Sequence, residues 1–172
     1  MIYLKTDEEV ELMRRSNDLL GRTLAEVAKV IRPGVTTAEL DKVAYEFICD
    51  NGGIPSCLGY EGYPATLCTS VNEQVVHGIP SDKVILKDGD IVSVDTVVKL
   101  GGFCADSAYT FPVGEVAPEV LQLMRTTKQA LYLGIEQAVT GRRLGDVGAV
   151  IQNHCEKAGY SVVREFVGHG IG

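Results

Sequence analysis

The chain has 172 residues, 45% hydrophobic and 23% charged, a composition typical of a soluble globular protein that buries one substantial core. Its formal net charge of −7 argues against a nucleic-acid-binding surface, because contacts to phosphates require clustered Lys and Arg. No apolar run approaches the roughly 20 residues of a membrane-spanning helix, and the acidic start of the chain is unlike a signal peptide.

The five cysteines are odd in number and show no CxxC spacing. Disulfide frameworks and zinc sites usually have paired or closely spaced cysteines. We therefore expect reduced thiols in a cytoplasmic protein that binds neither nucleic acid by itself nor a membrane.

The first part of the chain predicts two consecutive helices. Thr6 begins a capping box with Glu9, and an amphipathic pattern follows until Pro33-Gly34 ends it. A second helix starts after Thr36, which begins the same kind of box, and closes near Gly52.

Two strands are predicted next, over Ile91–Val98 and Phe103–Thr110, because both segments are rich in β-branched or aromatic residues. The four residues between them form a hairpin loop. This loop length places Asp95 directly opposite Asp106, with Cβ atoms roughly 5 Å apart. Two carboxylates at this distance repel each other, and apolar neighbours limit screening by water. The pair therefore indicates a bound cation or a shared proton. Two exposed aspartates on one face of the hairpin are the alternative.

A second pair of helices follows, over Pro118–Val139 and from about Leu144 to Ala158. The glycines that end these helices repeat the spacing of those in the first half, so an internal duplication of an ααβ unit is the simplest account. The duplication predicts a strand over Ser161–Val167. It also predicts a second hairpin in roughly 40 to 50 residues that would follow Gly172.

Two histidines are candidates for a functional site. His77 ends an extended segment and points into a loop, which favours substrate contact over a plain surface role. His169 lies in the glycine-rich run Gly168–Gly172, where the backbone can approach a ligand closely. Imidazole is a common ligand of divalent transition metals, whereas a flexible histidine in a turn is the alternative.

Three runs in this order carry a family resemblance: CLGYEGYPATLCTSVNEQVVHGIP, LKDGDIVSVDTVVKLGGFCADSAYTF and GHGIG. From Thr6 to its last residue, the chain resembles type I methionine aminopeptidases. The resemblance implies the α+β pita-bread fold, in which two ααβ halves related by a pseudo-twofold surround a central antiparallel sheet. Residues 1–172 would then be a single catalytic-type domain, truncated at its C-terminus and lacking the end of its second repeat.

The resemblance also implies a site with two divalent metal ions, which could be Co, Mn, Fe or Zn. Asp95, Asp106 and His169 match the family's metal ligands, with Asp106 bridging both ions. His77 matches the catalytic histidine that contacts the substrate near the scissile bond.

Four further positions match residues that line or border the family's pocket for the methionine side chain. They are Cys57, Tyr60, Tyr63 and Cys68. Aromatic and thiol groups suit a thioether, which prefers an apolar, polarisable wall. A loop that packs on itself is the alternative for these four residues.

The implied reaction is removal of the N-terminal methionine from nascent proteins and peptides, with a preference for a small second residue. A metal-bound hydroxide would attack the first peptide bond. The implied partners are nascent polypeptide N-termini, near the ribosome in the cytoplasm. Full-length members carry two more glutamate ligands and another histidine after GHG, so we expect this polypeptide alone to be inactive or weakly active.

Two other readings remain open. A proline-type aminopeptidase or prolidase relative would share the fold, but the dense match around CLGYEGYP and VNEQVVHGIP argues against it. A non-catalytic pita-bread binding module, or an inactive fragment, would keep the shape without binding metal. The metal content of the chain distinguishes the module from the enzyme.

Overall fold

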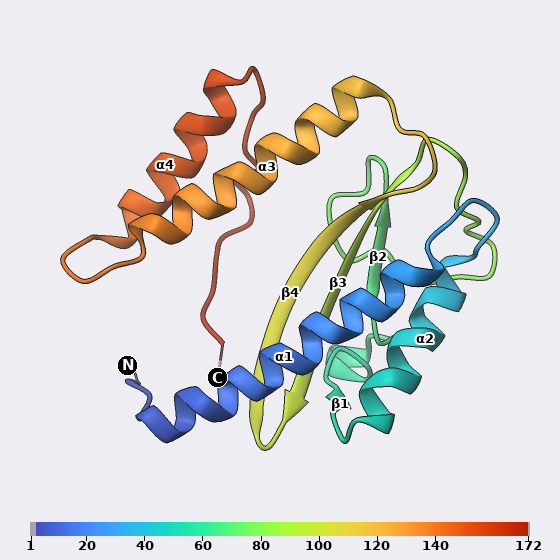
Figure 1. Cartoon of the computed structure of the whole chain (residues 1–172), viewed down its shortest axis with the longest axis horizontal. Coiled ribbons are helices and arrows are strands. Elements are labelled where there is room, and N and C mark those ends of the chain that lie inside the picture. The colour runs from blue at the N-terminus through green and yellow to red at the C-terminus, as the bar shows by residue number, and fades with distance from the viewer. Residues whose placement is uncertain (1–2, 172) are drawn as a thin grey trace. The chain divides into compact units, whose positions relative to one another are not determined.

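The computed structural model describes residues 3–171, so Gly172, the last residue of the glycine-rich run, lies outside the described residues. These residues divide into two compact units (Figure 1). The first unit runs up to Val116 and also includes Gly170 and Ile171, and the second covers Ala117–His169. The single domain expected over residues 1–172 stays a prediction.

The first unit combines two helices with a four-stranded sheet. In chain order its elements are α1 (Asp7–Val30), α2 (Thr37–Asp50), β1 (Ile54–Pro55), the 3₁₀ turn η1 (Tyr60–Gly62), β2 (Cys68–Val71), β3 (Ile91–Leu100) and β4 (Phe103–Pro112). The second unit contains α3 (Pro118–Gln137) and α4 (Leu144–Lys157).

Both capping boxes predicted from the sequence are confirmed. The Thr6 hydroxyl accepts the backbone N–H of Glu9 at 3.3 Å, and the Glu9 carboxylate accepts the N–H of Thr6 at 2.8 Å. Thr36 and Glu39 make the same reciprocal pair at the start of α2. Each box satisfies N–H groups that the first helical turn leaves without partners, which fixes where the helix begins.

Strand β3 is the centre of the sheet. It pairs with β4 along its whole length on one edge, while β1 and β2 pair with different ends of the other edge, all antiparallel. Helices α1 and α2 lie against one face of this sheet (Figure 1). The core between helices and sheet includes Leu20, Leu24 and Val27 of α1, Leu40, Ala44 and Ile48 of α2, and Val92, Val94 and Val98 of β3.

The direct opposition expected for Asp95 and Asp106 is wrong. The strands continue to Leu100 and Phe103, and the loop contains only Gly101 and Gly102, with φ angles of 61° and 93°. Two residues with positive φ form the tight turn whose twist matches that of the strands. The shorter loop shifts the pairing by two residues, so Asp95 lies opposite Ala108.

Helix α1 supports this shorter loop from the helix side of the sheet. The buried hydroxyl of Ser16 lies 3.0 Å from the carbonyl oxygen of Leu100 and 2.9 Å from that of Phe103. These carbonyls flank the glycine pair on both sides. The contact therefore ties the position of the turn to the position of α1.

The second unit contains the predicted pair of helices. A Cβ placed on Gly134 of α3 would lie 2.8 Å from Cδ1 of Ile151, so the small residue allows α4 to approach closely. The strand expected over Ser161–Val167 is wrong, because this segment has no strand conformation. A strand requires hydrogen bonds to a neighbouring strand, and residues 3–171 supply none to this segment.

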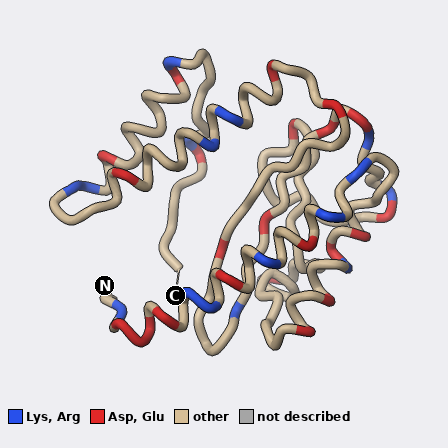
Figure 2. The backbone as a smooth tube through the Cα atoms, in the orientation of Figure 1, with Lys and Arg blue, Asp and Glu red and all other residues tan. Residues whose placement is uncertain are grey.

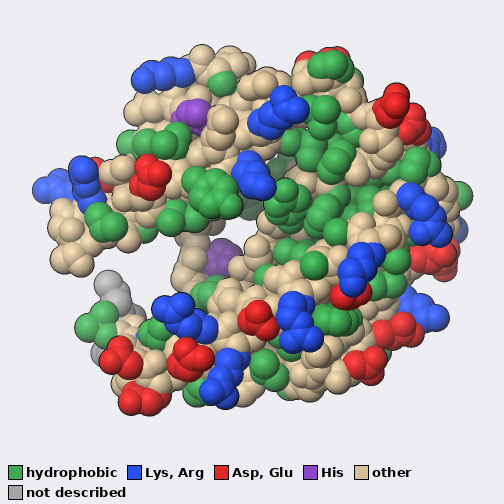
Figure 3. Space-filling model, viewed as in Figure 1, with side chains coloured by type: hydrophobic (Ala, Val, Ile, Leu, Met, Phe, Trp, Pro, Cys, Tyr) green, Lys and Arg blue, Asp and Glu red, His purple; other side chains and the backbone are tan. Residues whose placement is uncertain are grey.

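The solvent side of α1 carries charges of both signs (Figures 2 and 3). Glu11 lies 3.8 Å from Arg15, and Asp18 lies 3.7 Å from Arg22, both at the i, i+4 spacing. Within the described residues, no helix is both long and apolar enough to cross a membrane.

Candidate functional site

Asp95 and Asp106 project from the sheet face that α1 and α2 do not cover. Along β3, the side chains of Val94 and Thr96 are buried toward the helices, so Asp95 between them points the other way. Asp106 lies opposite Val97, which shares the face of Asp95. A two-residue shift of register keeps each side chain on its face. The aspartates are therefore diagonal neighbours, roughly 7–8 Å apart at Cα, and both are half-buried.

Small and polar side chains lie beside the aspartates on this face, together with Val97. Cys68 of β2 lies directly opposite Asp95, and Ser70 lies opposite Ser93. The hydroxyls of Ser93 and Thr110 lie 2.8 Å apart across β3 and β4. This face therefore carries polar groups beside the aspartates, in contrast to the valine-rich face of the core.

Two residues of the loop before β2 reach the same region. The backbone N–H of Val97 donates to Sγ of Cys57 at 3.3 Å, which places this thiol at the edge of β3. The hydroxyl of Tyr63 donates to the carbonyl oxygen of Leu67 at 3.0 Å or of Gly78 at 3.2 Å. The loop is thereby fastened to the strands that carry Asp95 and Cys68.

The pKa values of the neighbouring groups also show that these residues lie close together. Burial raises the pKa of the Cys57 thiol, and burial also raises the pKa of Cys68. The negative charges of Asp95 and Asp106 raise the pKa of both thiols further. Burial likewise raises the pKa of Tyr63, which interacts with the thiol of Cys68. Both aspartates thus act electrostatically on the two cysteines.

His77 lies in a loop rather than at the end of a strand, which corrects the sequence prediction. Strand β2 ends at Val71, and His77 is exposed with a φ of 60°, an uncommon conformation outside glycine. The next residue, Gly78, holds it there: the Gly78 carbonyl accepts the N–H of Thr69 at 2.7 Å, and its own N–H donates to Ser70 Oγ at 3.1 Å. Such strained residues occur often at functional sites.

Only a glycine fits at position 78. A Cβ at this position would lie 2.2 Å from the carbonyl oxygen of Thr69. The backbone of the loop therefore packs directly on β2. This close approach fixes the path of the chain on which His77 lies.

Two further predicted site residues come from other parts of the chain. Tyr60 belongs to η1 and is 69% exposed. His169 is exposed and belongs to the second unit, whereas both aspartates belong to the first. The roles of Tyr60 and His169 stay predictions, as do those of the other candidate residues.

Asp41 of α2 also shapes the site, although no sequence pattern indicated this role. Its Oδ1 accepts the backbone N–H groups of Thr66 at 2.9 Å and of Leu67 at 2.7 Å. These residues immediately precede Cys68. A lone carboxylate on an amphipathic helix normally indicates a solvated face, so only the tertiary contact reveals this role.

The aspartate pair fits the coordination chemistry of a divalent cation. Carboxylates are preferred ligands of hard divalent ions, and the two lie on one face with their negative charge acting on the same neighbours. Within residues 3–171, however, no group of three or more His, Cys, Asp or Glu side chains could surround such an ion. The role of Asp95 and Asp106 as metal ligands stays a prediction.

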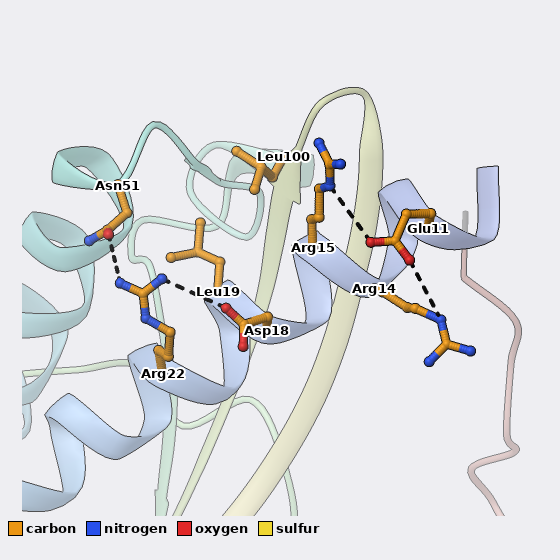
Figure 4. Close-up of a pocket in the computed structure, with 8 residues that line it drawn as sticks. All are labelled: Glu11, Arg14, Arg15, Asp18, Leu19, Arg22, Asn51 and Leu100. Carbon is orange, nitrogen blue, oxygen red and sulfur yellow. Dashed lines mark hydrogen bonds and ion pairs between the residues drawn. The ribbon is translucent and has the colours of Figure 1, made fainter. Parts of the chain in front are cut away.

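A hollow of about 460 Å³ lies elsewhere, against α1 (Figure 4). Three arginines dominate its lining, and they form ion pairs or hydrogen bonds with Glu11, Asp18 and Asn51. Leu100 lines it from the end of β3, on the helix side of the sheet. This hollow is therefore a solvated depression behind the sheet and does not include the aspartates.

The sequence matches metallopeptidase family M24 over residues 11–172. The chain belongs to this family. It is 50% identical over 172 residues to the methionine aminopeptidase of Clostridium perfringens, a match that covers 100% of this chain and 69% of the relative.

Solved structures of family M24 members support the same assignment at the level of the fold. The structure is similar to the methionine aminopeptidase of Rickettsia prowazekii, with a TM-score of 0.97, 42% identity, and coverage of 99% of this chain and 68% of that one. The prolidase of Pyrococcus furiosus matches with a TM-score of 0.78 at 18% identity, over 91% of this chain and 45% of that one. The fold is therefore the pita-bread fold of this family, and the protein is of the metallo-exopeptidase type.

Proposed function

We propose that this protein contributes to metal-dependent removal of N-terminal methionine from nascent proteins and peptides, with a preference for a small second residue. The observation that supports the proposal is that Asp95, Asp106 and Cys68 share one sheet face. Cys57 and Tyr63 are held by hydrogen bonds at the edge of the same sheet. These residues come from two separate runs of the sequence, Cys57–Pro80 and Leu86–Phe111. Relatives at 48% and 50% identity over the whole chain carry the name methionine aminopeptidase, which supports the same substrate.

Each group has a role that follows from its chemistry. Asp95, Asp106 and His169 would hold two divalent ions drawn from Co, Mn, Fe or Zn. When bound, such ions acidify a water molecule and polarise a peptide carbonyl. His77 would donate a hydrogen bond to the substrate near the scissile bond.

The cysteines and tyrosines would receive the methionine side chain. Cys57 and Cys68 are thiols that stay protonated at neutral pH, because burial raises the pKa of each. A neutral, polarisable sulfur suits contact with a thioether. Tyr63 is held in place through its hydroxyl group, and the exposed Tyr60 would border the pocket.

Metal binding is the first test. We expect calorimetric titration with Mn²⁺ or Co²⁺ to show weak binding, because the described residues contain no group of three potential ligands. Asp95→Asn and Asp106→Asn should each lower the affinity roughly 100-fold or more, since even outer-shell residues account for 10- to 100-fold. Asp18→Asn on the exposed side of α1 is the matched control and should bind metal normally.

Methionine release from a Met-Ala-Ser peptide is the second test, with an Ala-Pro dipeptide assayed in parallel. The metal-loaded chain should release methionine slowly, and the two aspartate variants should not. Methionine release that is equally fast in the wild type and in both aspartate variants would overturn the proposal. Faster cleavage of Ala-Pro would favour a proline-type relative, and absence of metal binding would favour a binding module.

A further inference from the structure

Two cysteines from different segments reach the same edge of β3. Cys57 follows β1, and Cys68 is the first residue of β2. Both strands pair with the edge of β3 that β4 leaves open. The chain therefore brings two thiols, separated by the loop that contains Tyr63, to one side of one strand.

Their positions along β3 are adjacent. Cys68 lies opposite Asp95, and Sγ of Cys57 accepts the N–H of Val97 at 3.3 Å. Asp95 and Val97 are two residues apart, which is about 6.6 Å along a strand. The sulfur of Cys57 and the backbone of Cys68 therefore meet β3 at neighbouring positions of one edge. A disulfide between them requires their Cα atoms to lie roughly 4.4–6.8 Å apart.

The electrostatics support this proximity. Cys68 is among the groups that raise the pKa of Cys57, and Asp95 and Asp106 act on both thiols. All five cysteines are free thiols in this structure. Cys104 lies on β4, at the other edge of β3, and Cys49 lies near the end of α2.

The two thiols differ in access to solvent. Cys57 is half-buried, whereas Cys68 is only 7% exposed. An oxidant from solution therefore meets Cys57 first. Cys68, held in the sheet behind it, is positioned to react with an oxidised Cys57 rather than with the oxidant.

We propose that Cys57 and Cys68 form a redox-active dithiol, which closes to a disulfide when a peroxide oxidises Cys57. The thiol of Cys57 loses its proton and the sulfur attacks one oxygen of hydrogen peroxide. The O–O bond breaks, Cys57 becomes a sulfenic acid, and the departing hydroxide takes up a proton and leaves as water. The sulfur of Cys68 then attacks the sulfur of Cys57. The S–S bond forms, the S–O bond breaks, and the hydroxyl leaves as water with the thiol proton, so two electrons pass from the thiols to the peroxide.

Closure would change the sheet face beside the aspartates. Cys57 would give up its contact with the Val97 N–H to reach Cys68, and the space between the two side chains would fill. If the methionine pocket lies here, oxidation blocks it and reduction reopens it. This consequence rests on the proposed function, whereas formation of the bond does not.

The experiment treats the full chain with hydrogen peroxide, alkylates the remaining thiols with N-ethylmaleimide, and maps peptides by mass spectrometry without reduction. The expected product is a Cys57–Cys68 linked peptide that disappears after dithiothreitol. In Cys68→Ser, the link is lost and dimedone should trap a sulfenic acid at Cys57. In Cys57→Ser, the link is lost and Cys68 should remain open to alkylation only after unfolding.

Cys49→Ser and Cys104→Ser are the matched controls and should keep the link, with circular dichroism confirming that every variant folds. A link from Cys57 to Cys104, or separate over-oxidation of Cys57 and Cys68 without a link, would overturn the proposal. Methionine release before and after oxidation tests the consequence for the pocket. A link that forms in a chain that binds no metal would contradict the proposed function alone.

Discussion

A single carboxylate, Asp41, holds the chain that leads into β2. Its Oδ1 accepts two backbone N–H groups, from Thr66 and Leu67. Asp41→Ala leaves both donors without an acceptor in a partly buried position and should lower the free energy of unfolding by about 2–3 kcal/mol. Asp41→Asn keeps a carbonyl oxygen at the same place and should cost much less. Urea denaturation measures both values, and equal losses would contradict this account.

The free energy of unfolding of the wild type and of Asp41→Asn should also depend differently on pH. Burial raises the pKa of Asp41 in the folded protein, although both hydrogen bonds oppose the shift. Between the unfolded and folded pKa values the folded state binds more protons, so its free energy of unfolding falls as pH rises. The asparagine of Asp41→Asn does not titrate, so this position contributes no pH dependence to the stability of the variant. The stability of the wild type relative to Asp41→Asn should therefore decline with rising pH, and an increase would show that the hydrogen bonds outweigh burial.

At the scale of elements, the two-residue turn between β3 and β4 decides which side chains meet. Gly101 and Gly102 both have positive φ, and no atom lies within 4 Å of a Cβ placed on Gly102. Gly102→Val should therefore cost about 1–2 kcal/mol through backbone conformation alone, because side chains disfavour this region. Gly101→Asn should be tolerated, since Asn suits the first position of this turn. Thermal denaturation compares the two, and a tolerated valine would argue against the observed turn.

The turn also explains why the aspartates could be placed on one face but not opposite each other. Side chains alternate between the two faces of a strand, so a register shift of two residues leaves every side chain on its original face. The same shift changes which residue on the neighbouring strand lies opposite. The alternation of Val92, Val94, Thr96 and Val98 fixed the faces of β3. The contact of Ser16 with the carbonyls at both ends of the turn lies far away in the sequence, so the hairpin sequence could not reveal it.

At the scale of the whole molecule, burial is distributed unevenly between the elements. In strand β3, fully buried side chains alternate with partly exposed ones, and neighbouring strands pair with both of its edges. Helix α4, in contrast, has no fully buried residue. Residues 161–167 have neither helix nor strand hydrogen bonds. Amide hydrogen exchange should therefore be slowest in β3, faster in α4 by roughly 100-fold or more, and fastest in residues 161–167. Protection in α4 equal to that in β3 would contradict this order.

The sequence by itself determined the features that depend on near neighbours. The capping boxes at Thr6 and Thr36, the helix-ending glycine at position 52 and the alternation along β3 all involve residues within a few positions of each other. Motif order also identified the family before any contact was known. These features are local because hydrogen bonds of a first helical turn and the direction of a strand side chain depend on the adjacent backbone.

Only the tertiary structure decided which distant groups meet. It joined Cys57 to Val97, Asp41 to the start of β2, and Gly78 to Thr69, in each case across an intervening loop or helix. It also left Ser161–Val167 without the strand that its apolar residues suggested. Hydrogen bonds between segments depend on which backbone groups packing brings within reach, and this information is spread over the whole chain rather than held in any one motif.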